Sequence, residues 1–125
     1  MKEFSVTLLN KPGQLAALAG RLADAGIHIE SLAAIGTDGE SLVRFMPDDA
    51  DVTRHVLNEA GVHFVERPII DTFLRDEPGA LAEMAEKLAD AGVNIDSIYL
   101  LHSNAEGLHF AVTVDDPELA QANLG

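Results

Sequence analysis

Cysteine and tryptophan are both absent from the 125 residues, and aromatic residues make up only 5% of the chain. The lack of cysteine excludes disulfide bonds, thiol catalysis and thiolate metal sites. There is also no run of about 18 apolar residues, and no apolar N-terminal segment with a basic flank. Together with the ordinary hydrophobic content of 47%, these absences favour a folded cytoplasmic protein.

Basic residues are scarce. The chain has 8 lysines and arginines against 21 acidic residues, which gives a formal net charge of −13. This field repels a phosphate backbone and an anionic membrane surface, so we expect neither nucleic acid nor membrane as a partner. The acids are spread along the chain rather than gathered in a tail, which favours a role in solubility.

The chain contains an internal repeat. Residues 10–32 read NKPGQLAALAGRLADAGIHIESL and residues 76–98 read DEPGALAEMAEKLADAGVNIDSI, a separation of 66 positions with 12 of 23 residues identical. An ungapped match of this length indicates a duplication, and it changes the expected domain count from one to two.

Both copies begin with a predicted strand and helix. Phe4, Val6 and Leu8 alternate with polar residues, as in a half-buried strand, and residues 70–74 are the equivalent apolar segment. Pro-Gly at 12–13 and at 78–79 then marks a helix start. The predicted apolar helix faces are Leu15, Leu18, Ala19 and Leu22 in the first copy, and Leu81, Met84, Ala85 and Leu88 in the second. Gly26 and Gly92 are expected to end these helices in a left-handed conformation.

A second predicted strand covers residues 27–35 or 93–101. In the first copy Asp38-Gly39 predicts a hairpin into residues 42–46, whereas residues 103–107 predict a looser turn into residues 108–114. The acids at 48–49 and 115–116 then open another helix.

The end of the first copy predicts a helix with an apolar face of Val52, Val56 and Ala60, ended by Gly61. Residues 62–65 supply a short fourth strand, and Glu66, Arg67 and Pro68 leave almost no free chain between the copies.

These elements predict an α+β fold of two ferredoxin-like βαββαβ units in tandem, residues 1–67 and 68–125, with antiparallel sheets and helices on one face. The second unit is expected to lack its last strand, which leaves the strand at residues 70–74 as a sheet edge. Because an apolar edge is a liability unless it is covered, we expect a homodimer or higher homo-oligomer, or cover by the other copy.

The Pro-Gly turn, the leucine-bearing helix, Ala25-Gly26 and the following Ile27-His28-Ile29-Glu30-Ser31 resemble the ACT domain family. The second copy, from Pro78-Gly79 to Asn94-Ile95-Asp96-Ser97, resembles it more closely. The first copy is also similar to the regulatory subunit of acetolactate synthase over its first strand, helix and second strand. The layout is most similar to small tandem ACT proteins without an attached enzyme.

This resemblance implies regulatory binding of an amino acid between paired units. It implies ligand contacts from the loop before the first helix and from the start of the second strand of a neighbouring unit. The implied loop residues are Asn10, Gly13, Gln14 and Leu15 in the first copy, and Asp76, Gly79, Ala80 and Leu81 in the second. The implied strand residues are His28, Ile29, Asn94 and Ile95.

The physical chemistry of a helix start independently supports a ligand site at this loop. A helix start presents unpaired backbone N–H groups that suit a carboxylate, and glycine allows close approach. Asn10 or Asp76 would accept from an ammonium group. The alternative is that these two side chains only brace the turn. Because Lys11 follows Asn10 whereas Glu77 follows Asp76, an anionic ligand group is expected to prefer the first loop, giving one stronger and one weaker site.

Catalytic and metal sites are not predicted. Serines 5, 31, 41, 97 and 103 fall in no nucleophile motif, and there is no Gly-rich phosphate loop. His102 and His109 are placed to face each other across the hairpin of the second copy, where a carboxylate such as Glu106 would complete a metal site. Two partly exposed strand histidines are the far more common arrangement, so we expect no metal and no cofactor.

The leading hypothesis is therefore a non-catalytic sensor or regulatory protein that binds a small molecule, an amino acid by resemblance. The second is a regulatory subunit that docks onto a metabolic enzyme, as the acetolactate synthase regulatory subunit does. A third is a structural module that binds nothing.

Overall fold

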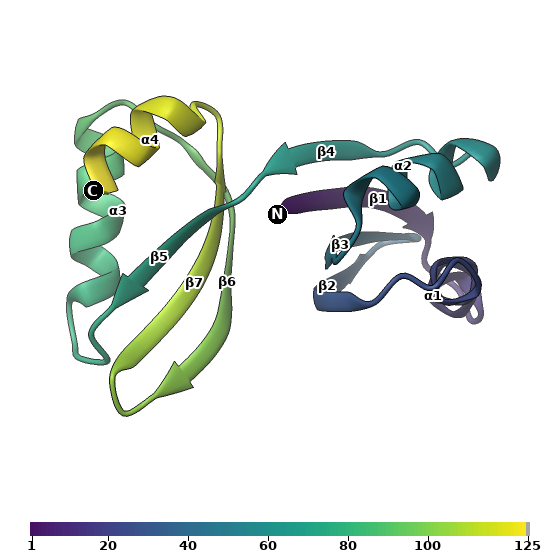
Figure 1. Ribbon diagram of the computed structural model, residues 1–125, viewed down its shortest axis with the longest axis horizontal. Helices are drawn as coiled ribbons and strands as arrows, with labels where there is room; N and C mark the ends of the chain where they lie inside the picture. Colours follow the sequence, from purple (N-terminus) through teal and green to yellow (C-terminus); the bar gives the residue numbers. More distant parts are fainter. Residues whose placement is uncertain (125) are drawn as a thin grey trace. The chain divides into compact units, whose positions relative to one another are not determined.

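The computed structural model describes residues 1–124, so that Gly125, the last residue of the predicted second unit, lies outside the described part. The chain divides into two compact units at the Arg67–Pro68 bond. The fold is α+β, and each unit carries its helices on one face of an antiparallel sheet (Figure 1).

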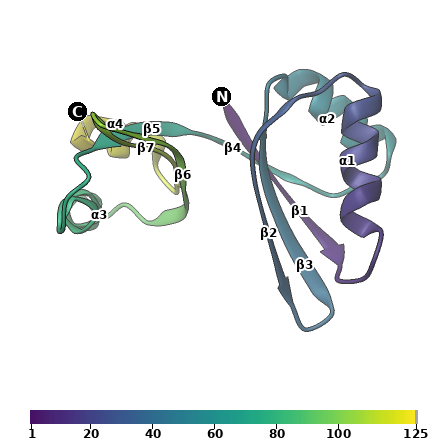
Figure 2. The same ribbon diagram turned by 90° about the horizontal axis from the view of Figure 1, so that it is seen from below.

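The first unit has the element order βαββαβ, as predicted. Its sheet has the strand order β2-β3-β1-β4, in which β3 pairs antiparallel with both β1 and β2. Figure 2 shows both helices on the same side of this sheet. The elements are β1 (Lys2–Leu9), α1 (Gln14–Asp24), β2 (Ile29–Thr37), β3 (Glu40–Pro47), α2 (Ala50–Glu59) and β4 (Val65–Pro68).

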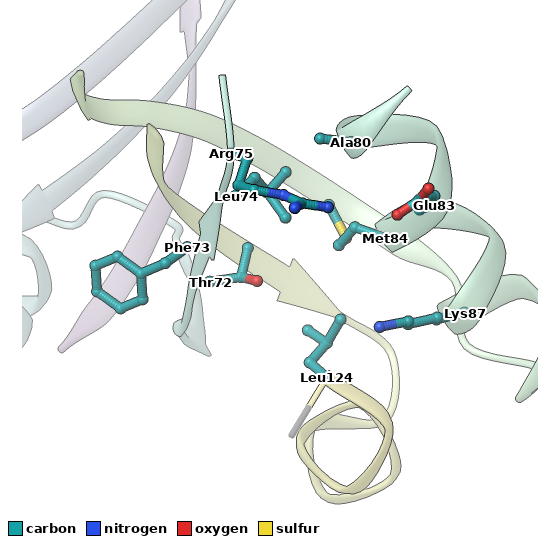
Figure 3. Close-up of a pocket in the computed structure, with 9 residues that line it drawn as sticks. All are labelled: Thr72, Phe73, Leu74, Arg75, Ala80, Glu83, Met84, Lys87 and Leu124. Carbon is teal, nitrogen blue, oxygen red and sulfur yellow. The ribbon is translucent and has the colours of Figure 1, made fainter. Parts of the chain in front are cut away.

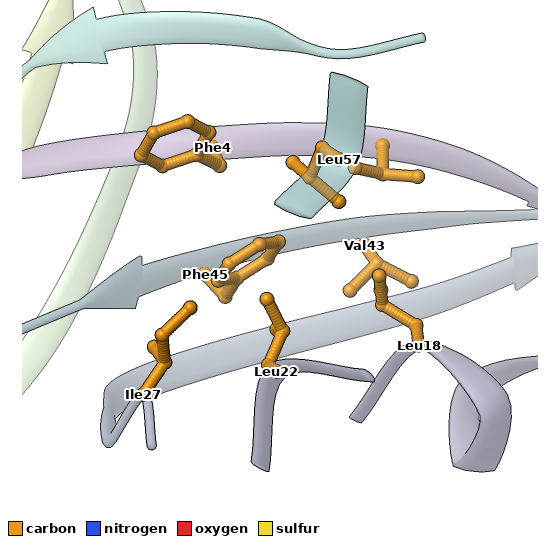
Figure 4. Packing of buried hydrophobic residues seen from close by; sticks show 8 residues of the cluster. Phe4, Leu18, Leu22, Ile27, Val43, Phe45 and Leu57 are labelled. Atoms are coloured by element: carbon orange, nitrogen blue, oxygen red, sulfur yellow. The ribbon is translucent and has the colours of Figure 1, made fainter. Parts of the chain in front are cut away.

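The register of β1 against β3 builds the core of this unit. Phe4 lies opposite Phe45 and Val6 opposite Val43, so the apolar sides of both strands face the helices together. The Phe4 and Phe45 rings are 5.8 Å apart, and both side chains are fully buried. The cluster is completed by Leu18 and Leu22 of α1, by Leu57 of α2, and by Ile27, which lies between α1 and β2 (Figure 4).

The predicted apolar face of α2 is confirmed at Val56, which packs against the core, but the fully buried residues lie one position further along the helix. Thr53 and Leu57 are the buried residues of this helix, whereas Val52 is 37% exposed. Thr53 escapes a search for apolar periodicity because it is a polar residue, yet its hydroxyl donates to the Asp49 carbonyl at 2.7 Å and so is satisfied inside the core. Asp49 also caps the helix, since its carboxylate accepts from the Val52 amide at 3.0 Å.

The predicted fourth strand is also displaced. The apolar residues Val62 and Phe64 pack against the core before the strand begins, and β4 itself covers Val65–Pro68. The three residues predicted as a connection therefore belong to the strand. Backbone pairing needs no apolar side chains, and Pro68 is tolerated because β4 lies at an edge of the sheet.

The second unit has the order βαββα and a three-stranded sheet, β5-β7-β6. In Figure 1 both of its helices lie on one side of this sheet. The elements are β5 (Ile70–Leu74), α3 (Ala80–Asp90), β6 (Ile95–Asn104), β7 (Gly107–Val114) and α4 (Pro117–Leu124). As predicted, β5 is an edge strand, which pairs only with β7 among the described residues.

The hairpin between β6 and β7 is tighter than predicted. Asn104 lies opposite Gly107, so only two residues form the turn. The Asn104 side chain closes it by accepting from the Glu106 amide at 2.8 Å and from the Gly107 amide at 3.2 Å. A side-chain acceptor of this kind replaces the turn dipeptide that the prediction sought.

Candidate functional site: the Pro-Gly loops and their grooves

The loops before α1 and α3 have the same backbone geometry. Gly13 has φ +90° and Gly79 has φ +91°, both in the left-handed region, and neither helix has a side-chain cap. A residue with a Cβ is disfavoured at this φ, so the glycines are required by the turn. The repeat in sequence is thus a repeat in conformation.

Each loop leaves backbone amides open at the helix start. The Gln14 amide donates to the Lys11 carbonyl at 3.4 Å, and the Ala17 amide donates to the Gly13 carbonyl at 3.0 Å. Between them, the amides of Leu15 and Ala16 donate to no acceptor among the described residues. The second loop repeats the pattern, with Ala80 donating to Glu77, Glu83 donating to Gly79, and the Leu81 and Ala82 amides open. Such N–H groups, at the positive end of the helix dipole, suit an anionic ligand group.

A groove adjoins each loop. In the first unit, a groove of about 390 Å³ runs beside the end of β1 and the start of α1, and its walls include Thr7, Gln14 and His63. In the second unit, a groove of about 190 Å³ lies at the equivalent place, beside β5 and α3 (Figure 3). Gln14 and Ala80, both among the predicted site residues, line the respective grooves.

Leu15 and Leu81 were predicted to lie on the apolar faces of their helices, but neither is a core residue. Leu15 is 40% exposed and Leu81 is 50% exposed, although they share a helical face with buried residues. Both lie in the first turn, beyond the end of the hydrophobic core. Their exposed side chains therefore belong to the surface around the loops.

Asn10 has a bracing contact. A Cβ added at Gly36 of β2 would lie 2.9 Å from the Asn10 Nδ2 atom, and the Asn10 amide donates to the Gly39 carbonyl at 2.9 Å. The Asn10 side chain therefore packs over the end of β2. Asp76, its equivalent in the second unit, is an exposed residue of the loop before α3.

The predicted strand residues lie at the other end of each sheet. Leu9, next to the first loop, is opposite Glu40, whereas Ile29 is opposite Pro47 at the far end of β3. Within the first unit the loop and strand residues are therefore not brought together. Ile29 and Ile95 are half-buried and pack against the cores.

His28 and Asn94 are held by equivalent backbone contacts. The His28 amide donates to the Asp48 carboxylate at 3.0 Å, and the Asn94 amide donates to the Asp115 carboxylate at 2.9 Å. These contacts use the backbone donors of both residues for structure, and leave their side chains exposed.

His102 and His109 lie opposite each other on β6 and β7, as predicted. However, the His109 Nε2 atom is 2.8 Å from the Asp71 carboxylate, and its ring stacks on Phe73 with 4.4 Å between centroids. Within residues 1–124 there is no group of three or more side chains that could hold a metal ion.

Sequence reasoning missed the charged walls of the second groove. Arg75, Glu83 and Lys87 line it. The spacing of Glu83 and Lys87, four residues apart on a predicted helix, was a signal that they share a face. Nothing in the sequence showed that this face borders a groove.

The ACT domain model matches residues 69–123, which is nearly the whole of the second unit. The second unit is an ACT domain. The first unit lies outside the matched range, but its first three strands and two helices follow in the same order. No helix in the described residues is both long and apolar enough to cross a membrane.

Solved structures share the fold of the whole chain. A protein from Bacteroides thetaiotaomicron matches with a TM-score of 0.83 and 22% identity, over 98% of this chain and 85% of that one. The regulatory subunit of aspartate kinase from Thermus thermophilus, in its ligand-free form, matches with a TM-score of 0.69 and 22% identity, over 98% and 87%. No curated protein matches the chain by sequence.

Proposed function

We propose that this protein is a non-catalytic regulatory protein of the ACT type that binds an amino acid at its Pro-Gly loops. The observation that carries the proposal is the loop itself, which occurs twice with a left-handed glycine, open helix amides and an adjoining groove. Open amides suit the carboxylate that every amino acid carries. Grooves of this size suit small molecules rather than a macromolecule.

The ligand contacts proposed in the first unit are Asn10, Gly13, Gln14 and Leu15, and those in the second are Asp76, Gly79, Ala80 and Leu81. His28, Ile29, Asn94 and Ile95 are proposed to contribute from a neighbouring unit, because they lie far from the loop of their own sheet. The ACT match to the second unit supports this assignment.

A thermal-shift screen of the purified chain against the twenty amino acids tests the proposal. A ligand at 100 times its dissociation constant adds about 2.7 kcal/mol of stability. For a domain of this size, that corresponds to a rise in melting temperature of roughly 3–6 °C. We expect a selective shift with one amino acid or a few related ones.

A matched pair of double variants then locates the site. Gly13→Asn with Gly79→Asn places a side chain over both loops, and asparagine tolerates the left-handed conformation better than most residues. Gly26→Asn with Gly92→Asn is the control, because these glycines also have positive φ and open space around them. We expect the first pair to abolish the shift and the second to retain it. If the first pair melts cooperatively and keeps the full shift, the loops are not the site.

A second candidate function is that of a regulatory subunit that docks onto an enzyme. It is favoured by the similar solved structures, which include regulatory subunits of aspartate kinase. If the wild-type chain shows no shift with any amino acid but purifies with an enzyme in fixed stoichiometry, this function replaces the first.

A further inference from the structure

The β6–β7 hairpin of the second unit contains a β-bulge that changes which side chains lie opposite each other. In the first unit, β2 pairs with β3 in continuous register over residues 32–37. In the second, the register of β6 against β7 shifts by one residue between Leu100 and His102. Leu100 lies opposite Phe110, which packs against the core, but His102 lies opposite His109, which points to the other side of β7. The bulge therefore turns His102 to the face of the sheet opposite the helices.

His102 completes a row of three flat rings on this face. Phe73 of β5 lies opposite His109 of β7, and His109 lies opposite His102 of β6, so the row crosses all three strands. The Phe73 and His109 rings are stacked, with 4.4 Å between their centroids and 16° between their planes. The His109 ring is also held by Asp71, whose carboxylate is 2.8 Å from its Nε2 atom. Phe73 is 74% exposed and points away from α3 in Figure 3, so one face of its ring is open.

A groove of about 260 Å³ adjoins the row of rings. Its walls are the three rings and the tip of the hairpin, where Asn104 and Glu106 contribute polar groups. The Asn104 carbonyl oxygen accepts from the two turn amides, which leaves the Nδ2 group of the same side chain as a donor toward a ligand. Among residues 1–124, none from α3 or from either Pro-Gly loop lines this groove. It is therefore separate from the groove of Figure 3.

The charge of the second unit restricts what this groove can hold. Its two basic residues are Arg75 and Lys87, and neither is among the described residues that line the groove. Glu106 and the net charge of −13 repel an anion. A ligand of this groove should therefore be flat, to match the rings, and should carry no phosphate or carboxylate group.

We propose that this groove binds a planar nitrogen heterocycle without a negative charge, of the nucleobase or nucleoside class. Its ring stacks on Phe73, as bases of any sequence stack on aromatic side chains. At the edge of the ring, Asn104 donates to a ring nitrogen or carbonyl oxygen, and Glu106 accepts from an N–H group. Pairing of a second chain at the β5 edge would use backbone groups and leave this face of the sheet open. The inference goes beyond the proposed function, because it concerns another groove and another class of ligand.

A nuclear magnetic resonance titration of the full chain with adenosine tests the inference. The ring current of a stacked base acts on nearby protons, so we expect the ring signals of Phe73, His102 and His109 to shift along one saturable curve. The signals of His28 and His55, which lie outside the groove, should not move. Adenosine 5′-monophosphate carries the same base with a negative charge, and should bind at least about tenfold more weakly.

Two pairs of variants locate the site. Phe73→Leu removes the exposed ring but keeps an apolar side chain, and should weaken adenosine binding about tenfold. Phe64→Leu removes a ring from the first unit, and should leave the affinity within about twofold. His102→Ala removes the ring that the bulge presents, and should weaken binding at least about threefold. His55→Ala removes an exposed histidine from α2 and serves as its control.

Three results would overturn the inference. Adenosine could leave all three ring signals unmoved, it could bind equally well to the Phe73→Leu and His102→Ala variants, or the monophosphate could bind as tightly as adenosine. None of these results bears on the proposed function, which is tested with amino acids at the Pro-Gly loops.

Discussion

Among single residues, Arg54 makes the clearest side-chain contact between two elements of the first unit. Its guanidinium makes a two-point contact with Glu66, with Nε 2.8 Å from one carboxylate oxygen and a terminal nitrogen on the other. The contact joins α2 to β4, the edge strand of the sheet. The hydrogen bonds from Arg54 lower the pKa of Glu66 and raise the pKa of Arg54 further above its ordinary value.

The pH dependence of stability should report this pair. Because the folded state lowers the pKa of Glu66, the contact stabilises the fold above the ordinary glutamate value of about 4.3. This stabilisation is lost as the pH falls through the lowered value. We therefore expect Glu66→Gln to melt below the wild type at pH 7, and the gap to close in acid.

Melting curves from pH 7 to about pH 3, well below the ordinary glutamate pKa, measure this gap. Glu59→Gln is the control, since Glu59 is exposed and its nearest partner, His55, is a distant 3.9 Å away. A Glu66→Gln deficit that persists unchanged in acid would show that the pair does not act through its charge.

At the scale of elements, the sequence predicted every strand and helix of both units, because apolar periodicity and turn residues agreed in two copies. The errors share one cause, which is that packing does not always follow apolarity. Thr53 is buried although polar, Leu15 is exposed although apolar, and β4 pairs through residues that follow the apolar segment. The Pro-Gly loops were predictable from their glycines, whereas the groove walls needed the tertiary structure.

The corrected face of α2 can be tested by two truncations. Leu57 is fully buried, so Leu57→Ala should lower the free energy of unfolding by about 2–5 kcal/mol through lost contacts and a cavity. Val52→Ala, at the exposed position of the predicted face, should cost no more than about 0.5 kcal/mol. Urea denaturation followed by circular dichroism gives both values. Equal losses from the two variants would show that Val52 is packed in the core, as the sequence predicted.

At the scale of the whole molecule, β5 and β6 are the two edges of the second sheet, and both carry exposed apolar side chains. Phe73 on β5 is 74% exposed and Leu100 on β6 is 53% exposed. An edge strand offers unpaired backbone groups to a second chain, and apolar side chains beside it favour such pairing. The net charge of −13 opposes association, but salt screens this repulsion.

We therefore expect the chain to form a homodimer in sedimentation velocity at physiological salt, through the edge that contains Phe73. Phe73→Lys places a charge on that edge and should weaken the dimer by at least about tenfold, since a lysine buried in an interface must lose its hydration. Leu119→Lys makes the same kind of change on α4, where Leu119 is 39% exposed, and should leave the dimer intact. A wild-type chain that sediments as a monomer at all concentrations would contradict the dimer. A dimer equally sensitive to both variants would place the contact elsewhere than on β5.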